Sequence, residues 1–177
     1  MVKRENNRRK KVLQLLFFLY ILLVIRLIIF KYPYSQLLAI SRTWTKGVFL
    51  EGLDSANFVP FKTIRMYIKY AYRLNSFENI IGNIQIMVPF GILLPCIWKV
   101  CEHIEELMMS AFLFVLGIEL FQLISAFGAF DVDDIILNCL GALIGYGGYY
   151  FISRNWNRSI SDRDETLQEN TGRERLM

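Results

Sequence analysis

The chain is poor in the residue types on which most catalytic and metal centres depend. Its 177 residues include one histidine and three cysteines. A single histidine argues against a zinc centre built on histidines and against a Ser–His–Asp triad. The cysteines, Cys96, Cys101 and Cys139, are odd in number and lie in or beside apolar segments, which predicts small buried thiols and no disulfide framework. We therefore expect no metal ion and no cofactor.

Charge is scarce in four long stretches of the chain. Hydrophobic residues make up 54% of the sequence, whereas soluble domains use roughly 45–50%. A helix needs about 20 apolar residues to cross a membrane, and four runs have that length. The four predicted spans are residues 12–30, 80–98, 107–127 and 135–152. The sequence therefore predicts an all-α fold, a multi-pass transmembrane bundle of four helices.

The segments outside these runs set the expected orientation. Residues 1–11 are basic, and no small-residue cleavage site follows the first run, so we expect an uncleaved span and no signal peptide. Four spans place both termini on one side, which we predict to be the cytoplasm. We expect residues 12–152 to form the membrane domain and residues 153–177 to be a disordered polar tail. The basic loop at 31–79 conflicts with the positive-inside rule, which leaves open whether it is wholly outside or partly re-entrant.

That loop contains a segment with the spacing of an amphipathic helix. Its basic face consists of Lys62, Arg65, Lys69 and Arg73. Its apolar face consists of Phe61, Ile64, Ile68 and Ala71. Such a helix either lies on the membrane surface and meets anionic lipid, or packs over the bundle with a solvated basic face. Because the basic residues flank spans and form no groove with interleaved aromatics, we expect no nucleic-acid partner.

Polar side chains stand at a similar depth in all four predicted spans. An isolated charge at the centre of a bilayer costs about 2.5–3.5 kcal/mol, so such groups turn inward, pair or line a wet cavity. The polar set consists of Arg26, Asn79, Asn83, Glu119, Gln122, Asp131, Asp133, Asp134 and Asn138. We predict that these residues form a pocket that opens outward. We also predict that Arg26 pairs with Glu119 or with an aspartate of residues 131–134.

The acidic residues allow two further interpretations. Asp131 can cap the fourth helix, and Asp133 and Asp134 favour the positive end of its dipole. Alternatively, Glu119 is a general base and the three aspartates hold a divalent cation through their oxygens. The sequence contains no activated nucleophile, no phosphate-binding glycine loop and no metal-ligand motif of recognised spacing. An enzymatic role is therefore the weaker interpretation, with Glu119 as its candidate catalytic residue.

Small residues and prolines add a pattern that concerns packing. Gly141 and Gly145 form a GxxxG motif, which lets two helix backbones approach closely. Pro89 and Pro95 lie inside the second predicted span and cannot donate to the preceding turn, so we expect kinks there.

Four segments resemble the VanZ-like family in their order and spacing. They are NFVPFKTI (57–64), ENIIGNIQIMVPFGILLP (78–95), GIELFQ (117–122) and FDVDDIILNCLGALIGY (130–146). The positions that match the recurrent residues of the family are Asn57, Pro60, Phe61, Asn79, Asn83, Pro89, Gly91, Glu119, Gln122, Asp131, Asp133, Asp134, Asn138 and Gly141. Cys139 stands where the family pattern leads us to expect threonine. The resemblance implies a small multi-pass bacterial membrane protein linked to resistance to the glycopeptide teicoplanin, with no established enzymatic activity.

Three classes of function follow from these patterns. The first is a protein of the cell envelope that modulates teicoplanin susceptibility, with membrane lipids and teicoplanin or a lipid-linked cell-wall precursor as partners. The second is an intramembrane enzyme that acts on a lipid or lipid-linked substrate. The third is a structural, partner-binding membrane protein in which the polar residues form only interhelical hydrogen bonds.

Overall fold

The fold is a bundle of helices, as the sequence predicts. The computed structural model describes the backbone of residues 2–28, 33–70 and 76–174, and the side chains of residues 7–28, 33–70 and 78–155. The described backbone contains no strand. In chain order the helices are α1 (Val2–Ile28), α2 (Tyr34–Thr43), α3 (Lys46–Ser55), α4 (Lys62–Lys69), α5 (Ser76–Ile97), the 3₁₀-helix η1 (Lys99–Glu102), α6 (Ile104–Ser125) and α7 (Val132–Glu174).

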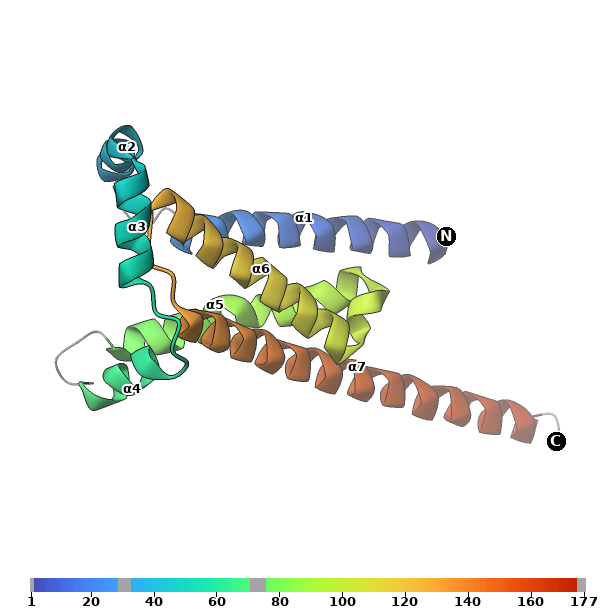
Figure 1. Cartoon of the computed structure of the whole chain (residues 1–177). Coiled ribbons are helices and arrows are strands. Elements are labelled where there is room, and N and C mark those ends of the chain that lie inside the picture. The colour runs from blue at the N-terminus through green and yellow to red at the C-terminus, as the bar shows by residue number, and fades with distance from the viewer. Residues whose placement is uncertain (1, 29–32, 71–75, 175–177) are drawn as a thin grey trace.

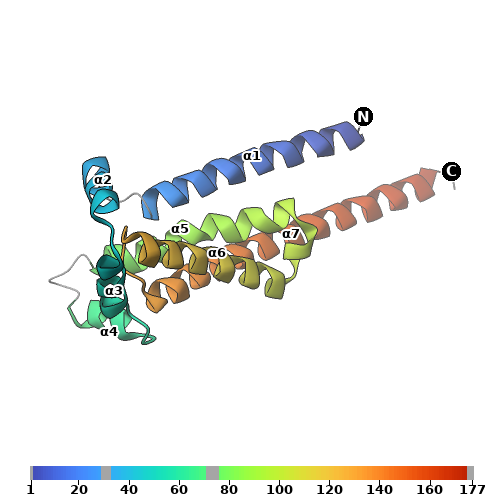
Figure 2. The ribbon, with the colours of Figure 1, turned by 45° about the horizontal axis from the view of Figure 1, so that its top comes forward.

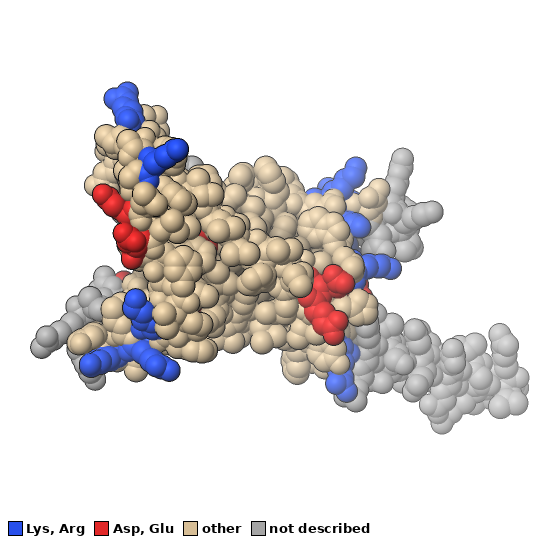
Figure 3. Space-filling model, in the orientation of Figure 1, with Lys and Arg blue, Asp and Glu red and all other residues tan. Residues whose placement is uncertain are grey.

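Four of these helices are long and apolar enough to cross a membrane. The candidate spans are Asn7–Ile28, Glu78–Ile97, Ile104–Ser125 and Val132–Asn155, which agrees with the four predicted spans. Figure 3 shows charged side chains at the two ends of the molecule and a broad uncharged belt between them. Leu15 and Phe18 on α1 are each 58% exposed. In a bilayer, lipid covers such surface, so the exposed apolar belt is expected for a membrane bundle.

Helices α5, α6 and α7 pack together, and α1 lies along α5 (Figures 1 and 2). The start of α1 and the end of α7 lie at the same end of the bundle, opposite α2, α3 and α4 (Figure 1). An even number of crossings requires this arrangement. Which side of the membrane that end faces stays a prediction.

Helix α7 continues to Glu174, well beyond the predicted end of the fourth span. We predicted a disordered tail for residues 153–177; the backbone of this range is helical up to Glu174, and residues 175–177 lie outside the described residues. No glycine or proline occurs between Gly148 and Gly172, so no residue of either type ends the helix after the apolar part.

The contact between α5 and α7 is a seam of glycines. A Cβ atom on Gly91 would overlap the backbone oxygen of Ala142. In the other direction, a Cβ on Gly141 would overlap the backbone oxygen of Ile84, and one on Gly145 that of Val88. The packing role predicted for the GxxxG motif is therefore confirmed. Because the backbones of α5 and α7 approach closely only at these glycines, the contact fixes how α5 is rotated about its axis.

The described part of the connection between α1 and α5 contains three helices, of which the sequence predicted one. The amphipathic helix is confirmed as α4, where Lys62, Arg65 and Lys69 are exposed. Ala71 and Arg73, which we assigned to the same helix, lie outside the described residues. The short helices α2 and α3 were not predicted. The Trp44 side chain between them donates a hydrogen bond to the backbone oxygen of Ile124 at 2.8 Å, which ties the connection to the end of α6.

Candidate functional site

The site begins where the segment before α4 pairs with the start of α7. The backbone N–H of Asn57 donates to the oxygen of Phe130 at 2.8 Å, and that of Val132 donates to the oxygen of Asn57 at 3.0 Å. These bonds form an isolated parallel bridge between Asn57 and Asp131. The pairing holds α4 against the first turn of α7.

Asp133 is completely buried and caps α4 from another helix. One carboxylate oxygen accepts from the backbone N–H of Phe61. The other accepts from the N–H groups of Thr63 at 2.7 Å and Ile64 at 3.0 Å. The first N–H groups of a helix have no partner within the helix, so Asp133 satisfies donors that burial would otherwise leave unpaired. Phe61 has a φ of 65°, which turns the chain into α4 at this point.

Asp131 caps its own helix, as one interpretation of the sequence predicted. Its Oδ1 accepts from the backbone N–H of Asp133 at 2.8 Å and from the side chain of Asn57 at 2.8 Å. Its Oδ2 accepts from the hydroxyl of Thr63 at 2.6 Å. Glu119, which is 2% exposed, accepts from the backbone N–H of Asp131 at 3.0 Å. We call Asn57, Thr63, Glu119, Asp131 and Asp133 the cap network.

A cavity of about 590 Å³ lies beside the cap network, between α1 and α5. We call it the α1–α5 pocket. Its lining consists of Tyr20, Leu23, Val24, Leu27, Ile28, Tyr67, Glu78, Asn79, Gly82, Asn83, Gln85, Ile86, Pro89, Gln122 and Asp134. The α5 residues recur every three or four positions and therefore share one face of that helix, while the glycine seam occupies another.

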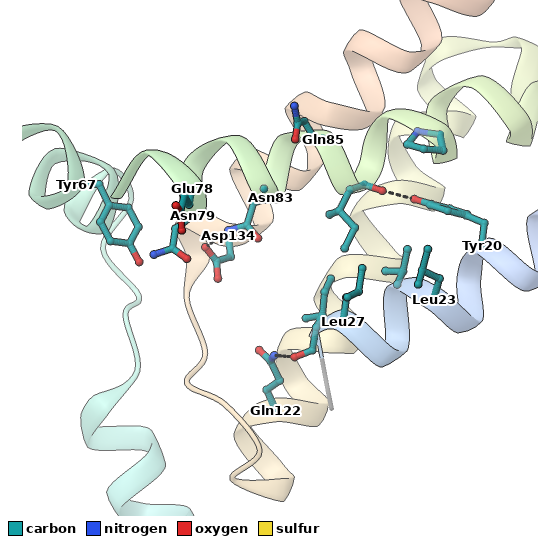
Figure 4. Close-up of a pocket in the computed structure, with 15 residues that line it drawn as sticks. Tyr20, Leu23, Leu27, Tyr67, Glu78, Asn79, Asn83, Gln85, Gln122 and Asp134 are labelled. Carbon is teal, nitrogen blue, oxygen red and sulfur yellow. Dashed lines mark hydrogen bonds between the residues drawn. The ribbon is translucent and has the colours of Figure 1, made fainter. Parts of the chain in front are cut away.

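The pocket has a polar end and an apolar end. Figure 4 shows Tyr67, Glu78, Asn79, Asn83 and Asp134 gathered beside α4, and Leu23 and Leu27 on the facing part of α1. Asn83 donates a hydrogen bond from its side chain to the Asp134 carboxylate at 2.6 Å. At the opposite end, Tyr20 donates from its hydroxyl to the backbone oxygen of Ile86 at 2.6 Å.

Tyr67 brings α4 into the polar end. Burial raises the pKa of its phenol, and the negative charges of Asp134 and Asp131 raise the pKa further. A hydrogen bond with the side chain of Asn79 acts in the opposite direction. The phenol therefore stays protonated at neutral pH and adds no charge to the pocket.

The comparisons with known proteins agree with this arrangement. The family model described as VanZ/LLP1 matches residues 17–153, which is most of the chain. The chain belongs to the VanZ/LLP1 family. It is also 31% identical over 147 residues to the protein named Protein VanZ from Enterococcus faecium, covering 82% of this chain and 78% of that protein. No solved structure matches the chain.

In this VanZ/LLP1 family member seven of the nine predicted polar residues are divided between two places. Asn79, Asn83, Gln122 and Asp134 line the α1–α5 pocket. Glu119, Asp131 and Asp133 belong to the cap network and do not line the pocket. Asp133 and Asp134 are separated in this way because successive residues of a helix point in directions about 100° apart.

The two remaining members of the polar set lie elsewhere. Asn138 is 2% exposed and donates from its side chain to the backbone oxygen of Asp134 at 2.7 Å. Its side-chain oxygen has no hydrogen-bond partner among the described residues. Arg26 is exposed on α1 and is not a lining residue. The predicted pairing of Arg26 with Glu119 or an aspartate stays a prediction.

The acidic residues are not arranged as ligands of a metal ion. Within the side chains that the structure describes, no group of three His, Cys, Asp or Glu residues could hold one. Both oxygens of Asp131 and both oxygens of Asp133 already accept hydrogen bonds from the protein. The divalent cation considered for the three aspartates is therefore not supported by the geometry.

Sequence reasoning missed four polar residues of the site. Tyr20, Tyr67, Glu78 and Gln85 line the pocket but were not among the predicted site residues. A signal was present for two of them, because Glu78 and Gln85 are polar residues seven positions apart and therefore share one face of α5. No spacing rule could have found Tyr67, since the place of α4 depends on its packing against α5 and α7.

Proposed function

We propose that this VanZ/LLP1 family protein lowers the susceptibility of a bacterial membrane to teicoplanin by binding an amphiphilic molecule in the α1–α5 pocket. The family supports the link to teicoplanin. The observation that carries the proposal is the pocket itself, whose carboxylate and amide end adjoins an apolar wall within the membrane belt. Teicoplanin is lipophilic and anchors in membranes, so a cavity with one polar and one apolar end suits it or the envelope lipid that it meets.

The cap network supports this proposal by positioning the polar end. Asp133 holds the start of α4, and α4 carries Tyr67 into the pocket. Glu119 lies beneath Asp131 and accepts its backbone N–H. A residue in that position stabilises the loop before α7 and does not meet a ligand in the pocket. The geometry therefore favours binding over the enzymatic alternative, for which Glu119 was the candidate.

Antibiotic susceptibility in a sensitive host tests the proposal. The host would express the wild type, Asp134→Asn in the pocket, or Glu105→Gln as a control on the exposed first turn of α6. We expect the wild type and the control to raise the minimal inhibitory concentration of teicoplanin more than that of vancomycin. Asp134→Asn should lose this rise at an equal protein level in the membrane. An unchanged teicoplanin value with the wild type, or full tolerance with Asp134→Asn, would contradict the proposal.

The proposal also places the polar end of the pocket on the outer side of the membrane. Ser55 lies at the end of α3 and is exposed. With the native cysteines replaced, Ser55→Cys should react with a membrane-impermeant maleimide in intact cells. Labelling only after the cells are opened would place the polar end in the cytoplasm and reverse the orientation.

A further inference from the structure

Helix α4 packs on the bundle with a different face from the apolar one that its sequence predicts. Its half-buried residues are Thr63, Ile64 and Tyr67, and its packing neighbours are α5 and α7. Among the described residues of the predicted apolar face, only Ile64 is half-buried. Phe61 is 50% exposed and Ile68 is 68% exposed. The described part of the bundle therefore leaves much of the apolar face of α4 uncovered.

The uncovered apolar residues extend into the segment before the helix. Phe58 is 57% exposed and Val59 is 59% exposed. Large apolar side chains that gather at a surface beside polar residues mark a contact with a membrane or with a partner. Four such side chains, at positions 58, 59, 61 and 68, therefore point to a covering surface outside the described chain.

A row of cations borders these apolar residues. Arg65 and Lys69 are one helical turn apart, and both are exposed. Each follows Ile64 or Ile68 by one position, so the basic row lies about 100° around the helix from the apolar one. The Nζ atom of Lys69 lies 5.4 Å from the ring centre of Tyr70. A basic row beside apolar and aromatic side chains is typical of helices that lie at the boundary between hydrocarbon and lipid head groups.

The position of α4 in the molecule matches this boundary. The candidate span of α5 begins at Glu78, shortly after α4 in the chain. Figure 3 shows the basic side chains over α4 at the edge of the uncharged belt. On the same face of the molecule, the acidic side chains at this end lie over α3. In a membrane, α4 would therefore lie among the head groups of the adjoining leaflet.

The residues that meet the leaflet in this arrangement form what we call the α4 surface, which consists of Phe58, Val59, Phe61, Arg65, Ile68 and Lys69. We propose that the α4 surface binds anionic phospholipid. The Arg65 guanidinium and the Lys69 ammonium group donate hydrogen bonds to the phosphate oxygens of the head group. The apolar side chains enter the acyl-chain region, which a soluble phosphate could not offer them. This inference goes beyond the proposed function, because it does not depend on a ligand in the α1–α5 pocket.

An environment-sensitive fluorophore on α4 tests the proposal in the full-length protein. With the native cysteines replaced, Ile68→Cys would carry the fluorophore in nanodiscs of phosphatidylcholine with or without phosphatidylglycerol. We expect phosphatidylglycerol to shift the emission to shorter wavelength, because the fluorophore enters a less polar environment, and high salt should reverse the shift. A fluorophore at Ser41→Cys, exposed on α2 at the same end, should not respond. No shift at position 68, or an equal shift at position 41, would overturn the inference.

Two charge variants separate a specific contact from general attraction to this end of the molecule. The double variant Arg65→Gln, Lys69→Gln removes the basic row of α4. The double variant Arg42→Gln, Lys46→Gln removes the same charges from the exposed surface of α2 and α3. We expect the first variant to lose the fluorescence shift and the second to keep it. Equal loss in both variants, or an undiminished shift in the first, would overturn the inference.

Hydrogen exchange of the wild-type protein keeps the test decisive without any substitution. The backbone of residues 58–69 should exchange more slowly in nanodiscs that contain phosphatidylglycerol than in phosphatidylcholine alone. Glycerol 3-phosphate added to the phosphatidylcholine nanodiscs should give no such protection. Unchanged exchange with phosphatidylglycerol, or equal protection by glycerol 3-phosphate, would overturn the inference. Protection by phosphatidylglycerol in a protein that confers no teicoplanin tolerance would contradict the proposed function alone.

Discussion

The cap network and the α1–α5 pocket each contain an aspartate, and the two aspartates are neighbours in the sequence. Their carboxylates accept hydrogen bonds from different kinds of donor. Asp133 accepts three backbone N–H groups from the segment that begins α4. Its neighbour Asp134 lines the cavity and accepts from the side chain of Asn83. The two carboxylates are therefore distinguished by what hydrogen-bonds to them and by whether they border a cavity. The first property is typical of a structural group and the second of a binding group.

The comparison shows why a buried acid in a membrane protein is weak evidence of chemistry. Backbone groups at membrane depth have no water to satisfy them, so an irregular segment needs acceptors from elsewhere in the protein. Asp133 serves this need for the N–H groups of Phe61, Thr63 and Ile64. Asp131 accepts from the side chains of Asn57 and Thr63. Their burial follows from the folding of that segment. The pocket depends on them indirectly, since they hold α4 where Tyr67 lines the cavity.

The largest effect should come from removing the cap carboxylate. Asp133→Ala leaves three N–H groups without their acceptor, and each unsatisfied buried donor costs about 1–3 kcal/mol. We expect a loss of roughly 3 kcal/mol or more, measured as a fall in Tm in detergent and in the amount of protein in the membrane. Asp134→Ala is the matched control and should lower stability far less. Equal destabilisation by the two variants would remove the distinction between the regions.

The next effect concerns the seam that holds the framework of both regions. Gly141→Ala places a Cβ on the backbone oxygen of Ile84, and overpacking of this kind costs typically about 1–3 kcal/mol. Gly148→Ala is the control on the same helix, because no atom lies within 4 Å of a Cβ built there. We expect a lower Tm for Gly141→Ala and an unchanged or higher Tm for Gly148→Ala. A neutral Gly141→Ala would show that α5 and α7 can separate without cost.

Glu119→Gln should have a smaller effect on both stability and function. Glutamine keeps an oxygen that can accept the N–H of Asp131, so we expect a change in stability of about 1 kcal/mol or less. Teicoplanin tolerance should persist, because Glu119 belongs to the cap network and not to the pocket. Loss of tolerance at an unchanged protein level would favour the enzymatic interpretation instead. This variant therefore tests the assignment of Glu119 to the structural region.

The sequence was sufficient for the spans, the amphipathic helix and the role of Asp131 as a cap, because each depends on residues close together in the chain. The sequence could not predict which polar residues line the pocket and which belong to the cap network. The depth of a side chain in the membrane follows from its position along the helix, but its direction depends on how the helix is rotated about its axis. Here the glycine seam fixes that rotation for α5. Asp133 caps α4 by accepting from Phe61, which lies 72 residues earlier in the sequence. No local pattern could have predicted this contact.

The smallest structural effect should come from Tyr67→Phe, which removes one hydroxyl from the polar end of the pocket. Tyr67 does not belong to the cap network, so stability should change by no more than about 0.5 kcal/mol. The hydroxyl lies beside the carboxyl groups of the pocket, so a ligand that reaches the polar end should bind more weakly without it. We expect a smaller rise in the minimal inhibitory concentration of teicoplanin than with the wild type, but a larger one than with Asp134→Asn. The control Tyr70→Phe alters an exposed phenol that does not line the cavity and should leave the rise unchanged. If Tyr67→Phe also lowers the Tm of the unliganded protein substantially, Tyr67 supports the fold, and the boundary between the two regions lies nearer the cavity than we place it.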